Sequence, residues 1–242
     1  MGTDNNSRYK KVTIDFYLMQ LKWVAWFIPC VLAAYLLLGR FIRDSVDLDL
    51  VFHAFMYQPS KVFMLICGIM ACFVFFNFYV RNGVTRKDVF LGTSIAAALL
   101  AVSIMIISVL LSAILMLIGS FTPFSPGMGQ LEFLGAEQNL LTFTLSTSLI
   151  IFSYYIGGWV ISVGFYRYGW LIGMAFIAIG VVLFALTDSF WEAEIAHSIA
   201  DSINITFPQL SFITSIVGTI VVIAASLYLV RQLTKSVRIK LQ

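Results

Sequence analysis

The stretch Arg81-Asn-Gly-Val-Thr-Arg-Lys-Asp-Val-Phe90 is a short polar segment between two long apolar runs. It holds three of the fifteen basic residues of the chain. Gly83 follows an apolar helical pattern, where a residue able to adopt a left-handed backbone conformation commonly ends a helix. Thr85 stands three residues before Asp88, which is the spacing of a capping box. The segment therefore predicts a helix end, a sharp turn and a short helix that leads directly into the next apolar run.

The composition on either side of this segment is that of a membrane protein. Of 242 residues, 60% are hydrophobic and 11% are charged, and the mean hydropathy is +0.95, whereas soluble domains hold about 45–50% apolar and about 25% charged residues. A membrane-spanning helix needs about 20 mostly apolar residues. We predict an all-α integral membrane protein with a single transmembrane domain over residues 1–242. Its six expected spans are residues 23–39, 62–80, 89–119, 140–165, 170–186 and 209–230.

Residues 8–22 have the pattern of an amphipathic helix before the first span. The apolar face consists of Val12, Phe16, Met19 and Trp23, and the polar face of Arg8, Lys11, Asp15 and Lys22. Such a helix can lie in the membrane interface, with its basic residues near anionic headgroups. We therefore expect an interfacial helix here. The alternative is a simple extension of the first span.

Local signals give further expectations along the chain. Pro29 is expected to kink the first span, which neighbouring helices make tolerable in lipid. Gly169 and Gly173 form a GxxxG pair, a weak sign of helix contact. Residues 120–138 contain two prolines and three glycines and predict an irregular loop. The acidic residues 187–208 predict a short amphipathic helix.

The distribution of basic residues predicts the orientation. With six spans, one side of the membrane carries both termini, the polar segment and twelve of the fifteen Lys and Arg residues. The other side carries three, which are Arg40, Arg43 and Lys61. Short cytoplasmic segments are enriched in Lys and Arg. We therefore expect both termini and the polar segment to face the cytoplasm.

No catalytic or metal-binding motif is found. The chain lacks the GxxxxGK[ST] phosphate loop, the HExxH zinc motif and the GxSxG nucleophile motif, and it has no basic arm for nucleic acid. Cys30, Cys67 and Cys72 all lie in apolar runs, so we expect three small buried hydrophobic residues. His53 and His197 fall in different outer segments, where we expect solvated or interfacial side chains.

The expected spans are also almost free of ionisable residues. Asn77 is the nearest polar exception, and a single amide more often joins helices than forms a site. Ion- and proton-coupled carriers usually place ionisable groups inside the membrane. If the chain transports a substrate, the energy is therefore expected from a separate subunit on the cytoplasmic side.

These features together resemble the small permease subunits of bacterial type-2 ATP-binding-cassette exporters. The segment Asn82-Gly-Val-Thr-Arg-Lys-Asp-Val-Phe90 is similar to the Gly-x-Thr/Ser-Arg-Lys pattern, followed by aromatic residues, that the family has between its second and third spans. Three other features also match the family: the predicted amphipathic helix of residues 8–22, the six spans, and the acidic residues 187–208 before the last span.

The resemblance implies a function and a set of partners. Gly83 would form the turn of a coupling helix, and Thr85, Arg86, Lys87 and Asp88 would dock a cytoplasmic ATPase subunit. Residues 8–22 would match the connecting helix of the family. ATP and magnesium would bind to the ATPase, and this chain would bind no cofactor and catalyse no reaction itself. A second permease subunit, identical or related, would complete an exporter of amphipathic or hydrophobic substrates in the bacterial cell membrane.

Three other readings stay open at this stage. In the first reading, the polar segment Arg81–Phe90 is an ordinary charged loop. In the second, the chain is a membrane-embedded accessory or assembly factor of an envelope complex, with no transport role. The third is an intramembrane enzyme or an ion-coupled carrier, which the lack of ionisable groups in the spans disfavours.

Overall fold

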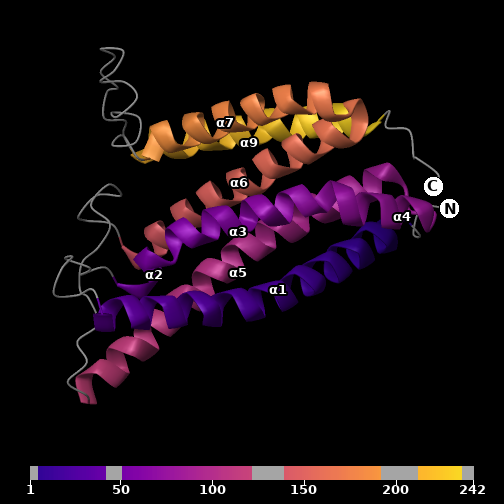
Figure 1. Ribbon diagram of the computed structural model, residues 1–242. Helices are drawn as coiled ribbons and strands as arrows, with labels where there is room; N and C mark the ends of the chain where they lie inside the picture. Colours follow the sequence, from indigo (N-terminus) through magenta and orange to yellow (C-terminus); the bar gives the residue numbers. More distant parts are fainter. Residues whose placement is uncertain (1–4, 42–50, 122–138, 192–211, 236–242) are drawn as a thin grey trace, which may run out of the picture.

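The fold is a bundle of long helices, seen in a computed structural model that describes residues 5–41, 51–121, 139–191 and 212–235 (Figure 1). Every regular element in this part of the chain is helical. The elements in chain order are α1 (Asn5–Phe41), α2 (Phe52–Phe55), α3 (Tyr57–Met70), the π-helix η1 (Ala71–Phe76), α4 (Asn77–Arg81), α5 (Arg86–Phe121), α6 (Leu140–Tyr168), α7 (Trp170–Trp191) and α9 (Phe212–Lys235).

Six segments are long and apolar enough to cross a membrane, as the sequence predicted. They are Tyr9–Gly39, Phe52–Arg81, Arg86–Ser120, Leu140–Tyr168, Trp170–Trp191 and Phe212–Lys235. The chain is thus a multi-pass helical membrane protein by the length and composition of its helices. The start of α1, the α4–α5 turn, the α6–α7 turn and the end of α9 lie at one end of the bundle (Figure 1). We call this the terminal end, and the other the opposite end.

Helix α6 is the centre of the bundle. In its most apolar window 72% of the residues are buried, against 22–47% in the other five spans. It contacts α3, η1, α5, α7 and α9. In Figure 1 α7 and α9 lie on one side of it and α3, α5 and α1 on the other. The remaining helices therefore present much of their apolar surface outward, as expected where lipid is the solvent.

Two glycines allow α3 and α6 to cross closely. A Cβ atom on Gly68 would overlap the carbonyl oxygen of Tyr155, and one on Gly158 would overlap the carbonyl oxygen of Leu65. Both overlaps involve backbone atoms, which cannot turn aside as a side chain could. Small residues at these positions let two helix backbones approach closely, and the van der Waals packing that results is one of the forces that join helices in lipid.

Helices α6 and α7 form an antiparallel hairpin in which rings cover glycines. The ring of Phe184 covers Gly157, that of Phe176 covers Gly164, and that of Phe165 covers Gly173. The GxxxG prediction holds for one of its two glycines. Gly173 lies at this helix contact, whereas Gly169 forms the turn between the helices with φ of +82°.

Helix α1 is one uninterrupted helix, with Pro29 inside it. The structure has no break near residue 22, where the sequence favoured a separate interfacial helix. Phe16 is fully buried, and its ring lies 4.3 Å from that of Phe75 and 5.8 Å from that of Tyr79, measured between centroids. The apolar face of residues 8–22 therefore packs largely on protein.

The second span begins earlier than the sequence predicted, and this corrects the placement of His53. Helix α2 begins at Phe52, and His53 is buried instead of solvated. Its Nδ1 atom lies 3.1 Å from Oγ of Ser112 in α5, and its ring meets the ring of Phe143 edge-on. The aromatic residues that flank His53 pack inward, which extends the helical segment beyond the strictly apolar run.

Other expectations have mixed outcomes. Cys67 and Cys72 are buried as predicted, but Cys30 is exposed, because it lies on the outward face of α1. Of the helix predicted for residues 187–208, the first part belongs to the end of α7 and the rest lies outside the described residues. Of the loop predicted for residues 120–138, residues 120 and 121 belong to the end of α5, and the rest, like His197, lies outside the described residues.

Candidate functional site

The polar segment forms a tightly hydrogen-bonded turn between α4 and α5. Gly83 has φ of +78°. Its N–H donates to the carbonyl of Val80 at 3.2 Å, and the N–H of Val84 donates to the carbonyl of Tyr79 at 3.1 Å. These two bonds make a Schellman motif, which satisfies carbonyls at the end of α4. The predicted helix end at Gly83 is therefore present, and a local backbone requirement explains the glycine.

The start of α5 is capped as its sequence predicted. The backbone N–H of Asp88 donates to Oγ1 of Thr85 at 3.2 Å, and the Thr85 hydroxyl donates to Oδ2 of Asp88 at 2.7 Å. Helix α5 then continues from Arg86 to Phe121 without interruption. The expected short helix is thus the first turn of α5, because no helix-breaking residue separates it from the apolar run.

The two basic residues of this turn have different surroundings. Arg86 is half-buried, and its Nη1 donates to the carbonyl of Lys235 in the last turn of α9 at 2.8 Å. Lys87 is exposed, and in the described part of the chain it makes no hydrogen bond or ion pair. Asp88 is only 7% exposed. Of the predicted docking residues, Gly83, Thr85 and Lys87 face outward, while Arg86 and Asp88 hold the turn in place.

A second arginine reaches the same end of α9. Nη1 of Arg167, near the end of α6, donates to the carbonyl of Leu233 at 2.9 Å. The last carbonyls of a helix have no partner within the helix and carry a partial negative charge. Arg86 and Arg167 therefore cap α9 and join the ends of three helices. No local pattern in the sequence announces this contact.

The residues proposed for an interfacial helix divide by face. Lys11, Asp15, Met19 and Lys22 are exposed, Trp23 is half-buried and Phe16 is buried. Through the contact of Phe16 with Tyr79, this part of α1 lies against α4, directly before the polar turn. The two predicted groups of residues therefore lie at the same end of the bundle.

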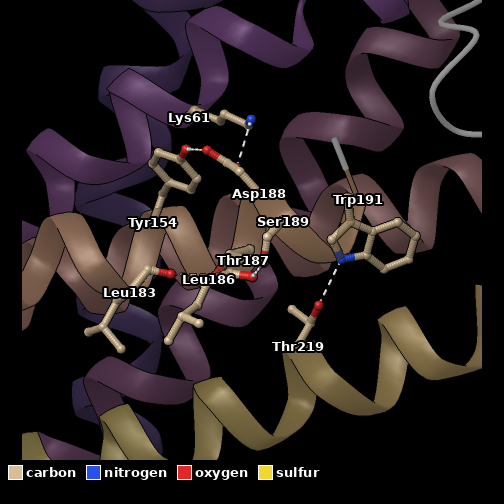
Figure 2. A network of polar contacts seen from close by, with 9 residues as sticks. All are labelled: Lys61, Tyr154, Leu183, Leu186, Thr187, Asp188, Ser189, Trp191 and Thr219. Atoms are coloured by element: carbon tan, nitrogen blue, oxygen red, sulfur yellow. Dashed lines mark hydrogen bonds and ion pairs between the residues drawn. The ribbon is translucent and has the colours of Figure 1, made fainter. Parts of the chain in front are cut away.

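The opposite end holds a buried ion pair that the sequence analysis missed (Figure 2). Nζ of Lys61 in α3 lies 3.1 Å from Oδ1 of Asp188 in α7, and Lys61 is only 4% exposed. The hydroxyl of Tyr154 in α6 donates to Oδ2 of Asp188. The Lys61 ammonium also lies 4.5 Å from the ring centroid of Tyr57 and 5.2 Å from that of Tyr154. One network thus joins three helices.

The sequence analysis expected spans almost free of ionisable residues, and this network adds two such residues towards the ends of two spans. The sequence placed Lys61 and Asp188 in segments outside the membrane, next to the apolar runs 62–80 and 170–186. In the structure both helices extend past those runs, so both residues lie within candidate spans. The sequence did contain a signal for this ion pair. Lys61 and Asp188 carry opposite charges, and each borders an apolar run on the same side of the predicted membrane topology.

A further contact ties α7 to α9 beside this network. Nε1 of Trp191 donates to Oγ1 of Thr219 at 2.7 Å (Figure 2). The hydroxyl of Ser215 donates to the carbonyl of Phe190 at 2.6 Å. Helix α9 is therefore held by hydrogen bonds at both ends, to α5 and α6 at one and to α7 at the other.

No three His, Cys, Asp or Glu side chains gather to hold a metal ion in the residues that the structure describes. The candidate sites are thus the capped polar turn, with its link to α9, and the buried ion pair. Comparison with known proteins finds no family model, no curated protein and no solved structure that matches the chain.

Proposed function

We propose that this chain is the membrane-spanning permease subunit of a bacterial type-2 ATP-binding-cassette exporter. The observation that carries the proposal is the rigid polar turn at the terminal end of the bundle, capped on both sides and linked directly to the start of a long span. Twelve of the fifteen basic residues fall on this side in the predicted topology, which supports a cytoplasmic location for it and for both termini.

The capped turn has the properties that a docking element needs. The hydrogen bonds of Gly83 and Thr85 stabilise one backbone shape, so little conformational entropy is lost when a partner binds. Lys87 offers an exposed positive charge to a carboxylate on the partner. A displacement of the turn would act on α5 directly and on α9 through Arg86. In this proposal the partner is a cytoplasmic ATPase subunit, and its surface contacts Gly83, Thr85 and Lys87.

The remaining parts of the exporter follow from the same proposal. ATP and magnesium bind to the ATPase subunits, and this chain contributes no catalytic residue. A second permease chain, identical or related, pairs with it in the bacterial cell membrane. Residues 8–22 of α1 act as the connecting helix beside the turn, at the membrane interface. The predominantly apolar helices suit export of a hydrophobic or amphipathic substrate, such as a peptide, an antibiotic or a lipid-like molecule.

Co-purification from the native cell tests this function. A tagged wild-type chain is expected to bring down an ATPase subunit with a phosphate-loop motif. Lys87→Glu should greatly reduce the amount recovered, because it reverses the exposed charge without touching the contacts that hold the turn. Lys22→Glu is the matched control, since Lys22 is also exposed but lies in α1. Recovery of no ATPase with the wild-type chain would favour the accessory-factor alternative.

The buried Lys61–Asp188 pair favours a second candidate, an ion-coupled carrier. Ionisable residues within spans often serve proton or ion pathways. Here, however, each charge neutralises the other, and Tyr154 occupies the second carboxylate oxygen, so the pair has the character of a structural tie. Substrate uptake into vesicles driven by a proton gradient, with no ATPase present, would favour the carrier over the exporter.

A further inference from the structure

Three arginines converge on the last two turns of α9. Arg86 and Arg167 donate to the carbonyls of Lys235 and Leu233. The guanidinium carbon of Arg231, one turn earlier on α9, lies 5.4 Å from the ring centroid of Phe90 in α5. All three arginine side chains are half-buried. Three arginine side chains therefore lie at the junction of α5, α6 and α9.

The positive charge at this junction has little compensation from the protein. In the part of the chain that the structure describes, no carboxylate lies within ion-pair distance of Arg86, Arg167 or Arg231. The end of α9 supplies only about half of one negative charge. Asp88 on α5 is the acidic residue next to the junction, and its carboxylate accepts the hydroxyl of Thr85. A negatively charged ligand would supply the missing charge.

Exposed aromatic side chains lie beside this junction. The α6–α7 turn that follows Arg167 exposes two amphipathic aromatic side chains, with Tyr168 41% and Trp170 74% exposed. Tyr and Trp gather at the headgroup layer of membrane proteins, where one part of the ring is apolar and the other is polar. Two such residues beside Arg167 support a position of the neighbouring guanidinium groups near the lipid phosphates.

We propose that this junction, formed by Arg86, Arg167 and Arg231, binds the phosphate headgroup of an anionic membrane lipid. Each guanidinium has five N–H donors, and at Arg86 and Arg167 a single nitrogen, Nη1, serves the α9 carbonyl. The others can bind phosphate oxygens, which match the planar guanidinium well. Basic pockets between transmembrane helices bind anionic headgroups in this manner. The bound lipid would join α5, α6 and α9 at the end where the capped turn lies.

Native mass spectrometry of the purified chain tests this site. The detergent-solubilised protein is titrated with phosphatidylglycerol and, separately, with phosphatidylcholine of the same acyl chains. Phosphatidylglycerol should bind with clear preference. Arg231→Gln should weaken that binding about fivefold, which corresponds to the contribution of one basic residue near a lipid surface. Arg231 is the informative position, because its side chain makes no hydrogen bond within the described residues and its substitution leaves the caps of α9 in place.

Three outcomes would overturn the proposal. The first is equal binding of the two lipids by the wild-type chain. The second is an equal loss in Lys87→Gln, a matched change at an exposed lysine of α5 outside the proposed site, because this would show diffuse attraction instead of a site. The third is full competition by inorganic phosphate with no preference for phosphatidylglycerol, which would assign the site to a free anion. An unchanged melting temperature of Arg231→Gln in phosphatidylcholine confirms that the variant is folded.

Discussion

Lys61 and Asp188, separated by 127 residues in the chain, form a buried ion pair with 3.1 Å between Nζ and Oδ1. The pair joins α3 to α7, and Tyr154 adds α6 through the second oxygen of the carboxylate. Each charge is stabilised by its partner, because Lys61 is only 4% and Asp188 only 14% exposed to solvent. The ends of three helices are therefore coupled through two charges.

Removing one member of this pair should destabilise the protein. We expect Lys61→Met or Asp188→Leu alone to lower the free energy of unfolding by about 3 kcal/mol, because each removes the charge that neutralises the other inside the bundle. The double variant should recover most of the loss, since apolar residues of similar volume can replace a buried pair. Thermal unfolding in detergent measures both effects. Lys87→Met, at an exposed lysine without an ion-pair partner in the described residues, is the control, and an equal loss there would contradict the prediction.

The contact between α3 and α6 should be sensitive to a single methyl group. Gly68→Ala places a Cβ against the carbonyl oxygen of Tyr155, so the helices must separate. We expect a loss of about 1–3 kcal/mol or more in unfolding free energy. Gly39→Ala in α1 is the matched control, because no atom lies within 4 Å of the added Cβ. Its stability should be unchanged or higher, since alanine favours helix over glycine. Similar losses in both variants would argue against close packing at Gly68.

Features of this protein that depend on residues close together in the chain could be predicted from its sequence. The turn at Gly83 and the cap at Thr85 were predictable, because both depend on residues at most five apart. The six spans were predictable because lipid requires continuous apolar runs. The residues at which the spans begin and end were less predictable. Helices at Phe52 and Asp188 continue past the apolar runs, since tertiary partners there satisfy the polar side chains.

The contacts between helices could not be predicted from one sequence. Arg86 and Lys235 are 149 residues apart, and Arg167 and Leu233 are 66 apart. Amphipathic patterns show that a helix has a buried face, but they do not identify the neighbour that covers it. Phe16 illustrates the point. Its position on the apolar face was correctly predicted, but no local pattern identified Phe75 and Tyr79 as the rings that cover it.

The left-handed turn should make Gly83 sensitive to any side chain that disfavours positive φ. Gly83→Ala should lower the unfolding free energy by about 1–2 kcal/mol, the difference for an L-residue in the left-handed region. No atom lies within 4 Å of the added Cβ, so backbone strain alone is responsible. Gly83→Asn should lose less, because asparagine tolerates this conformation. Thermal unfolding ranks the three proteins, and equal stability of all three would contradict the left-handed turn.

Arg86 and Lys87 are neighbours in sequence, and their substitution should separate stability from docking. Arg86→Gln removes a cap of α9 and should lower the unfolding free energy by about 1 kcal/mol, the usual net value of a hydrogen bond. Lys87→Gln touches no partner within the described residues and should change stability by less than about 0.5 kcal/mol. Thermal unfolding of the isolated chain measures this difference. Equal losses would show that the contact of Arg86 with the Lys235 carbonyl does not stabilise α9. With the expected outcome, a loss of ATPase binding in a Lys87 variant reports docking alone, whereas a loss in an Arg86 variant also includes the released end of α9.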